Sequence, residues 1–110
     1  MVLHAMPKEV APTLASEALI WTKEAMIAGR YLVDPHVPKR MAQRAVLWRS
    51  LWYGIRNATT CVPYAPDEGP RLGGTSWRIV GPDHNGEEIT VGVETLVDHL
   101  GRRVLLLTVF

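Results

Sequence analysis

The segment EITVGVETL, residues 88–96, carries the pattern that decides the fold. Apolar side chains occupy positions 89, 91 and 93, whereas Thr90, Gly92 and Glu94 occupy the positions between and after them. Alternation of this kind predicts a β-strand that buries one of its two faces. The neighbouring sequence is consistent with a sheet built around this strand.

Two further strand-like segments flank it in the chain. Residues 76–81 precede it, and the pair Asn85-Gly86 between the two suits a tight turn with positive φ angles. Residues 103–110 follow it. Because the middle of this last segment is apolar on both faces, it is expected to be central in the sheet or covered on both sides. We expect the three segments to form an antiparallel meander.

Two helical stretches come before the strands. Residues 13–28 repeat apolar side chains at helical spacing, with Thr13 expected to cap the start and Gly29 to end the helix. Residues 35–57 are expected to form either one helix or two short ones that meet near residues 45–46. The side chains of this stretch expected to include its most buried residues are Trp48, Leu51, Trp52 and Ile55.

The remaining segments are short. Residues 31–33 link the two helical stretches, residues 59–62 suit an edge strand, and residues 63–74 are a loop rich in proline and glycine. The sequence therefore predicts an α+β fold, with N-terminal helices packed on one face of a three- to four-stranded antiparallel β-meander. We expect one domain over residues 1–110, in which residues 1–33 add an N-terminal helix to a unit formed by residues 34–110.

Composition excludes several classes of protein. With 110 residues, a net charge of +1 and 47% hydrophobic residues, the chain is neither a disordered tail nor a histone-like polycation. The single cysteine, Cys61, cannot form an intramolecular disulfide, and we expect it to be a small buried apolar residue. No apolar run approaches the length of a membrane span, and residues 1–12 lack the pattern of a signal peptide, so a cytoplasmic location is expected. No phosphate-binding glycine motif or metal-ligand spacing is present, and no cofactor is expected.

The charges are distributed unevenly along the chain. Residues 1–57 contain eight Lys and Arg against four Asp and Glu, whereas residues 58–110 contain four against seven. Residues 35–66 contain no carboxylate. Such a segment presents positive charge either to an anionic partner or to the acidic half of its own fold.

The segment HVPKRMAQR, residues 36–44, has the strongest functional pattern. Its His36, Arg40 and Arg44 are four residues apart, so a helix aligns them on one face. Guanidinium groups bind phosphate and stabilise charge that develops on it, and imidazole moves protons near neutral pH. These three residues are the catalytic candidates. The candidates for nucleic-acid binding are Lys39, Arg49 and Arg78.

A structural role is the alternative for the basic row. Arg40 and Arg44 can instead pair with a sheet carboxylate, and Glu94 is the first candidate because it alternates away from the apolar face of its strand. The aromatic residues of the second helical stretch also have two interpretations. Stacking on nucleic-acid bases is one, and packing in the core is the one expected for Trp48 and Trp52.

Residues 36–110 resemble an uncharacterised bacterial domain family that is similar to the BrnT and RelE toxin superfamily. The matching residues are His36, Arg40, Met41, Arg44, Leu51, Ile55, Asn57, Trp77, Gly81, Gly86, Val91 and Thr108. The resemblance implies a small sheet with packed helices and a concave sheet face that, in RelE-like toxins, binds RNA. Leu47 departs from the serine or threonine helix cap usual in the family, and the helix over residues 13–28 lies outside the match.

Two functions are compatible with these patterns. The first is a RelE-like RNA-directed protein, acting on RNA or the ribosome as a metal-independent ribonuclease toxin, with His36 carrying protons and Arg40 and Arg44 holding the phosphate. The second is a non-enzymatic protein-interaction module of immunity or accessory type, whose partner is an antitoxin or cognate protein. The basic helix without carboxylates and the resemblance support the first, and the extra N-terminal helix and the modest net charge support the second.

Overall fold

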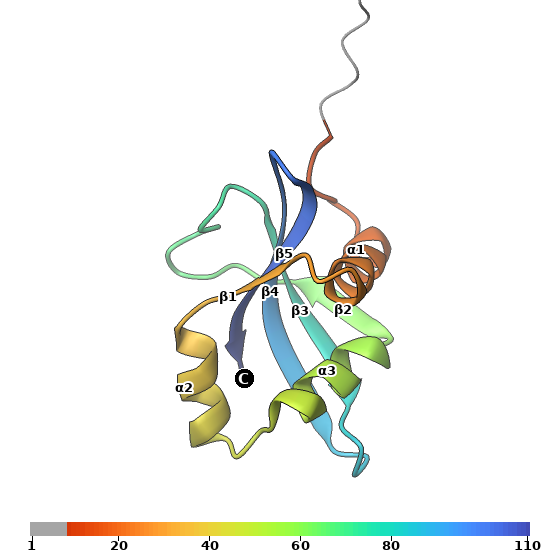
Figure 1. Ribbon diagram of the computed structural model, residues 1–110, viewed down its shortest axis with the longest axis vertical. Coiled ribbons are helices and arrows are strands. Elements are labelled where there is room, and N and C mark those ends of the chain that lie inside the picture. Colours follow the sequence, from red (N-terminus) through yellow and green to blue (C-terminus); the bar gives the residue numbers. More distant parts are fainter. Residues whose placement is uncertain (1–8) are drawn as a thin grey trace, which may run out of the picture.

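A five-stranded sheet with the strand order β1-β5-β4-β3-β2 organises the computed structural model, which describes residues 9–110 (Figure 1). The first eight residues of the predicted N-terminal segment, and with them most of the segment tested for an export signal, lie outside the described residues. The elements are α1 (Ala15–Ile27), β1 (Tyr31–Val33), α2 (His36–Gln43), α3 (Trp48–Arg56), β2 (Thr60–Pro63), β3 (Thr75–Pro82), β4 (Glu88–Asp98) and β5 (Gly101–Val109). The α+β class predicted from the sequence is confirmed.

The meander forms as expected. Strands β3, β4 and β5 pair antiparallel in sequence order. In the turn between β3 and β4, Gly86 has a φ of 82°, but the positive φ expected at Asn85 is not found, because the Asp83 carboxylate accepts from the backbone N–H groups of Asn85 and Glu87 and shapes the turn differently. Strand β2 pairs antiparallel with β3 at one edge of the sheet, which confirms the predicted edge strand. A register shift between Gly92 and Val93 interrupts the β4–β5 pairing.

The expectation of a purely antiparallel sheet with three to four strands is wrong. Residues 31–33, expected to be a link, form β1 and pair in parallel with β5. The backbone continues this pairing at both ends, where Val104 donates to the carbonyl of Arg30 and Asp34 donates to the carbonyl of Leu106. Strand β5 is apolar on both faces and lies inside the sheet. Strand β4 pairs with one of its edges, and β1 pairs with the other. Three residues are too few to show the alternation that reveals a strand.

The stretch over residues 35–57 consists of two helices. They are separated at residues 44–47, where Ala45 has a φ of 53° in the left-handed region, a conformation that ends helical hydrogen bonding. Gly29, with a φ of 72°, follows the end of α1 as predicted. Thr13 does not cap α1, because the helix starts after Leu14 and no side chain caps it.

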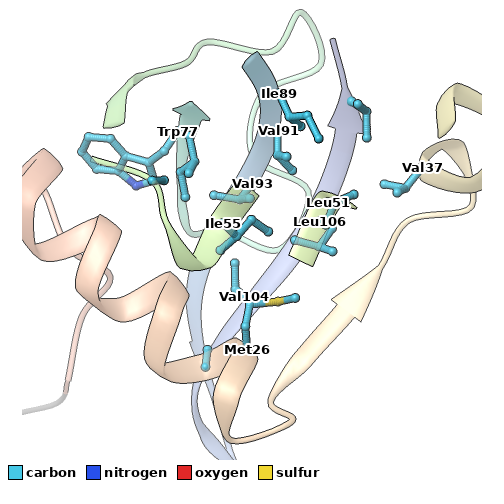
Figure 2. Close-up of a cluster of buried hydrophobic side chains, with 14 of the residues drawn as sticks. Met26, Val37, Leu51, Ile55, Trp77, Ile89, Val91, Val93, Val104 and Leu106 are labelled. Carbon is cyan, nitrogen blue, oxygen red and sulfur yellow. The ribbon is translucent and has the colours of Figure 1, made fainter. Parts of the chain in front are cut away.

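All three helices of the described residues contribute to one core on the same face of the sheet (Figure 2). Leu51 and Ile55 of α3 are fully buried, as predicted, and point at the sheet residues Val93 and Leu106. Trp52 is partly buried, whereas Trp48 is 39% exposed and lies at the margin of this core. The helix therefore turns its Leu51–Ile55 side to the sheet and its tryptophans toward the edge.

Helix α3 lies unusually close to β3. A Cβ atom added to Gly81 of β3 would overlap the carbonyl oxygen of Gly54 in α3. The contact between the two elements is therefore made by main-chain atoms at this point, and only glycine fits at position 81.

The opposite face of the sheet has a smaller cluster. Leu96, Leu105 and Leu107 are buried there, and Leu32 and Tyr64 pack against them. This confirms that β5 is covered on both faces. No helix among residues 9–110 has the length and apolar character needed to cross a membrane.

Replacing Leu51 by alanine should lower the free energy of unfolding by roughly 2–5 kcal/mol, because a fully buried side chain leaves a cavity. Leu47→Ala is the matched control. Its side chain is 56% exposed, so the change should stay within about 0.5 kcal/mol. Urea unfolding followed by circular dichroism measures both. Similar losses in the two variants would contradict the orientation assigned to α3.

Candidate functional site

Helix α2 begins at a buried carboxylate. The Asp34 side chain is 8% exposed, and its Oδ1 accepts a hydrogen bond from the backbone N–H of His36 at 2.8 Å. The Asp34 carbonyl accepts from Val37 N–H at 2.9 Å, which closes the first turn through the intervening proline. The hydrogen bond from its backbone N–H to Asp34 therefore holds His36 in the first turn of α2.

A second buried carboxylate holds the loop over residues 64–74 against the sheet. Glu94 of β4 is fully buried and accepts hydrogen bonds from the backbone N–H groups of Arg71 (2.6 Å), Leu72 (2.8 Å) and Gly74 (3.2 Å). A Cβ atom at Gly74 would overlap the carbonyl oxygen of Thr95, so glycine is required for this close approach. Three donors satisfy a charge that is otherwise costly to bury.

Of the two alternatives for the basic row, the one in which Arg40 or Arg44 pairs with Glu94 is wrong. Alternation does turn Glu94 away from the apolar face, as expected, but backbone amides of the loop occupy its oxygens. Arg40 instead donates from Nε to the carbonyl oxygen of Val109 at 3.2 Å and from Nη1 to Gln43 Oε1 at 3.2 Å. Within residues 9–110, no carboxylate lies within ion-pair distance of Arg40.

Arg71 joins the loop to α2. Its guanidinium forms an ion pair with Asp34, the carboxylate that accepts the His36 backbone N–H, and its other amino group lies 3.9 Å from Glu68. The Asp34 carboxylate thus has partners from both the loop and the helix. These contacts hold the start of α2 and the loop at a fixed separation.

A cavity of about 330 Å³ lies between α2, this loop and the end of β5. Its lining residues are His36, Arg40, Tyr64, Pro66, Asp67, Glu68, Gly69, Arg71, Leu107, Thr108 and Phe110. The cavity therefore combines an imidazole and two guanidiniums with two aromatic rings, while Asp67 and Glu68 add negative charge on the loop side.

The structure brings some of the predicted site residues together and separates others. His36 and Arg40 line the cavity, whereas Arg44 lies at the exposed end of α2 and does not. Lys39 and Arg49 are exposed and are also outside the lining.

Arg78 does not line the cavity itself, but its guanidinium contacts two aromatic rings that do. Its guanidinium carbon lies 4.2 Å from the centre of the Phe110 ring and 5.0 Å from that of Tyr64, distances typical of cation–π contacts. The two rings meet edge to face at 5.3 Å.

Sequence patterns did not indicate Tyr64, Arg71 or Phe110 as site residues. Two of them belong to a loop without periodicity, and Phe110 follows the last residue of β5. The one available signal was the single arginine within the loop over residues 63–74.

The basic segment over residues 35–66 is not neutralised by ion pairs. In the part of the chain that the structure describes, the cations that form ion pairs are Arg71, Arg102 and Arg103, none of which belongs to this segment. Pairing with the acidic half of the fold was one of the two expectations, and it is not seen as direct contacts. The other expectation was an anionic partner. Such a partner would bind at α2 and α3, because these helices carry most of the charges.

No group of three or more His, Cys, Asp or Glu within residues 9–110 is arranged to hold a metal ion. Comparisons with protein-family models, with curated proteins and with solved structures found no match. The functional assignment therefore depends on the geometry of the site.

Cys61 is partly buried in β2, and burial raises the pKa of its thiol to about 11. A thiol with such a pKa is almost entirely protonated at neutral pH, so it is a poor nucleophile. This agrees with the expectation that it packs as a small apolar residue.

Replacing Glu94 by glutamine should lower the free energy of unfolding by about 1–3 kcal/mol, because an amide N–H₂ then faces backbone donors. The amide protons of Arg71, Leu72 and Gly74 should lose hydrogen-exchange protection. Glu88→Gln is the control, since Glu88 is exposed at the start of the same strand. Unchanged protection of the three amides would contradict the role assigned to Glu94.

Alkylation of Cys61 by iodoacetamide at pH 8 should be at least about tenfold slower in the folded protein than in urea. A pKa near 11 instead of the usual 9.0 reduces the thiolate about a hundredfold, and the greater nucleophilicity of the more basic thiolate offsets only part of this. The rate should rise continuously as pH increases toward 11. Equal rates with and without urea at pH 8 would be inconsistent with the burial of this thiol.

Proposed function

We propose that the cavity binds the phosphate backbone of single-stranded RNA. The observation that carries this proposal is that His36 and Arg40 line one cavity while Arg40 has no carboxylate partner among the described residues. Nη2 of Arg40 makes no hydrogen bond with these residues, so it is free to donate to a phosphate oxygen. The absence of ion pairs in the basic segment supports the same assignment.

The aromatic side of the cavity suits a nucleotide base. Tyr64 and Phe110 are partly exposed, and Arg78 lies over both rings. Bases stack on aromatic rings and on guanidinium planes with little sequence preference. One nucleotide can therefore place its phosphate at α2 and its base at these rings. Lys39 and Arg44, at the exposed side of α2, are proposed to contact phosphates farther along the strand.

We further propose metal-independent cleavage at this site. The 2′-oxygen of a nucleotide attacks the adjacent phosphorus while the bond to the 5′-oxygen of the next nucleotide breaks, which yields a 2′,3′-cyclic phosphate and a 5′-hydroxyl. His36 accepts the proton of the 2′-hydroxyl, and the leaving 5′-oxygen takes a proton from water. The hydroxide formed from that water takes the proton from His36, which returns the imidazole to its neutral form. Arg40 stabilises the negative charge that develops on the phosphate. A RelE-like architecture belongs to this proposal and is supported by helices packed on one face of a sheet.

A second candidate is a non-enzymatic protein-interaction module. The exposed position of Trp48 on α3 favours it, because a large aromatic side chain at a protein surface is typical of interfaces. This candidate concerns a different surface from the cavity.

Arg40→Ala should weaken binding of a fluorescein-labelled single-stranded RNA by about tenfold, since one charge-assisted phosphate contact is lost. Wild-type affinity should fall steeply between 50 and 200 mM salt. Arg56→Ala, which removes an exposed cation outside the cavity, should change affinity by less than about threefold. Fluorescence polarisation measures all three. Affinity that is unaffected by Arg40→Ala and by salt would overturn RNA binding at this site.

His36→Ala should abolish cleavage while leaving RNA affinity within about threefold, because the imidazole acts in proton transfer more than in binding. DNA of the same sequence should bind and remain intact, since it lacks the 2′-hydroxyl. Gel analysis of the products tests both. RNA that is bound but never cut by the wild-type protein would limit the function to RNA binding.

A further inference from the structure

A second hollow lies on the helical side of the molecule, between the end of α1 and the first turns of α3. It has a volume of about 230 Å³ and is lined by Met26, Ile27, Gly29, Tyr31, Trp48 and Trp52. None of these residues lines the cavity of the proposed RNA site. We refer to it as the α1–α3 groove.

Apolar side chains on both walls of the groove are exposed to solvent. Ile27 is 72% exposed and Trp48 is 39% exposed. The rings of Trp48 and Tyr31 contact each other with their centres 5.8 Å apart, so the aromatic wall is held in place by packing. Ordered, adjacent and exposed aromatic side chains are typical of protein-binding surfaces.

The α3 side of the groove is basic. Arg49 lies three residues before Trp52 and Arg56 lies four residues after it. The helix therefore places both arginines beside Trp52. Both are exposed, and among residues 9–110 neither forms an ion pair. On the α1 side, Glu24 is exposed one turn before Ile27. Lys23, also on α1, donates to the carbonyl oxygen of Ala58. Arg49 and Arg56 are therefore exposed cations without an ion pair beside the α3 wall of the groove.

We propose that the α1–α3 groove docks an acidic amphipathic helix of a partner protein. A large apolar side chain of that helix enters between Ile27 and Trp48, and its carboxylates face Arg49 and Arg56. Charge complementarity selects this occupant, because the unpaired cations adjoin an apolar groove and residues 35–66 supply no acid of their own. A groove between two helices suits a third helix, which anchors through side chains three and four residues apart.

The probe for this proposal is a synthetic fifteen-residue helical peptide with leucines along one face and glutamates on the rest. The matched peptide carries lysine in place of each glutamate. With the full-length protein, the acidic peptide should bind at least about tenfold more tightly than the basic one in fluorescence anisotropy. The double variant Arg49→Glu, Arg56→Glu should reverse this preference. Lys39→Glu, on α2 and outside the groove, should leave it unchanged.

The apolar contact is tested separately. Trp48→Ala should weaken the acidic peptide by about tenfold or more, as expected for an exposed aromatic anchor. Ile27→Glu, on the other wall, should weaken it as well without affecting the fold, since Ile27 is largely exposed. Circular dichroism confirms that both variants fold.

Four results would overturn the proposal. They are equal binding of the two peptides, no binding of either, indifference to both Trp48→Ala and Ile27→Glu, and concentration-dependent dimerisation that Trp48→Ala abolishes, which would assign the groove to a second copy of the chain. RNA competition separates this site from the cavity, because RNA should not displace the peptide. Loss of RNA binding in the Arg49, Arg56 variant as severe as in Arg40→Ala would instead assign these cations to the RNA surface.

Discussion

The carboxylate of Glu94 determines the arrangement of the cavity side of this protein. A charge buried in the middle of a sheet is tolerated only when donors surround it, and here the donors are three backbone N–H groups of one loop. The loop must therefore lie against the sheet at these residues. That constraint places Arg71 beside Asp34, and Asp34 in turn holds the first turn of α2. His36 and Arg40 reach the cavity because this chain of contacts begins in the interior of the sheet.

Much of the fold could be predicted from the sequence, because strands and helices reveal themselves by periodicity. The alternation around Val91 and Val93 and the helical spacing of Leu51 and Ile55 were interpreted correctly. The parallel strand β1 could not be found in this way, because its three residues show no pattern and each pairs with a residue of β5 that is 73 positions later in the chain. Trp48 was misplaced for a related reason. Hydropathy alone cannot separate the edge of an apolar stripe from its centre.

The candidate site was predictable only in its helical half. A four-residue spacing identified His36 and Arg40, since local geometry brings them together. The loop residue Arg71 and the rings of Tyr64 and Phe110 come from distant parts of the chain, and only tertiary structure brings them to α2. The partners of Glu94 were beyond prediction for another reason, because every residue except proline has a backbone N–H and the amides that bind it leave no mark in the sequence.

The close approach of Gly54 to Gly81 has a consequence for the α1–α3 groove, which Trp48 and Trp52 line. Where helices rest on side chains, their distance from a sheet varies with the size of those side chains. Here main chain meets main chain, so the height of α3 above β3 is set by backbone atoms that no substitution in the surrounding core enlarges or shrinks. The tryptophans of α3 accordingly have a rigid support. Substitutions that change the size of core side chains should therefore leave the depth of the groove unchanged.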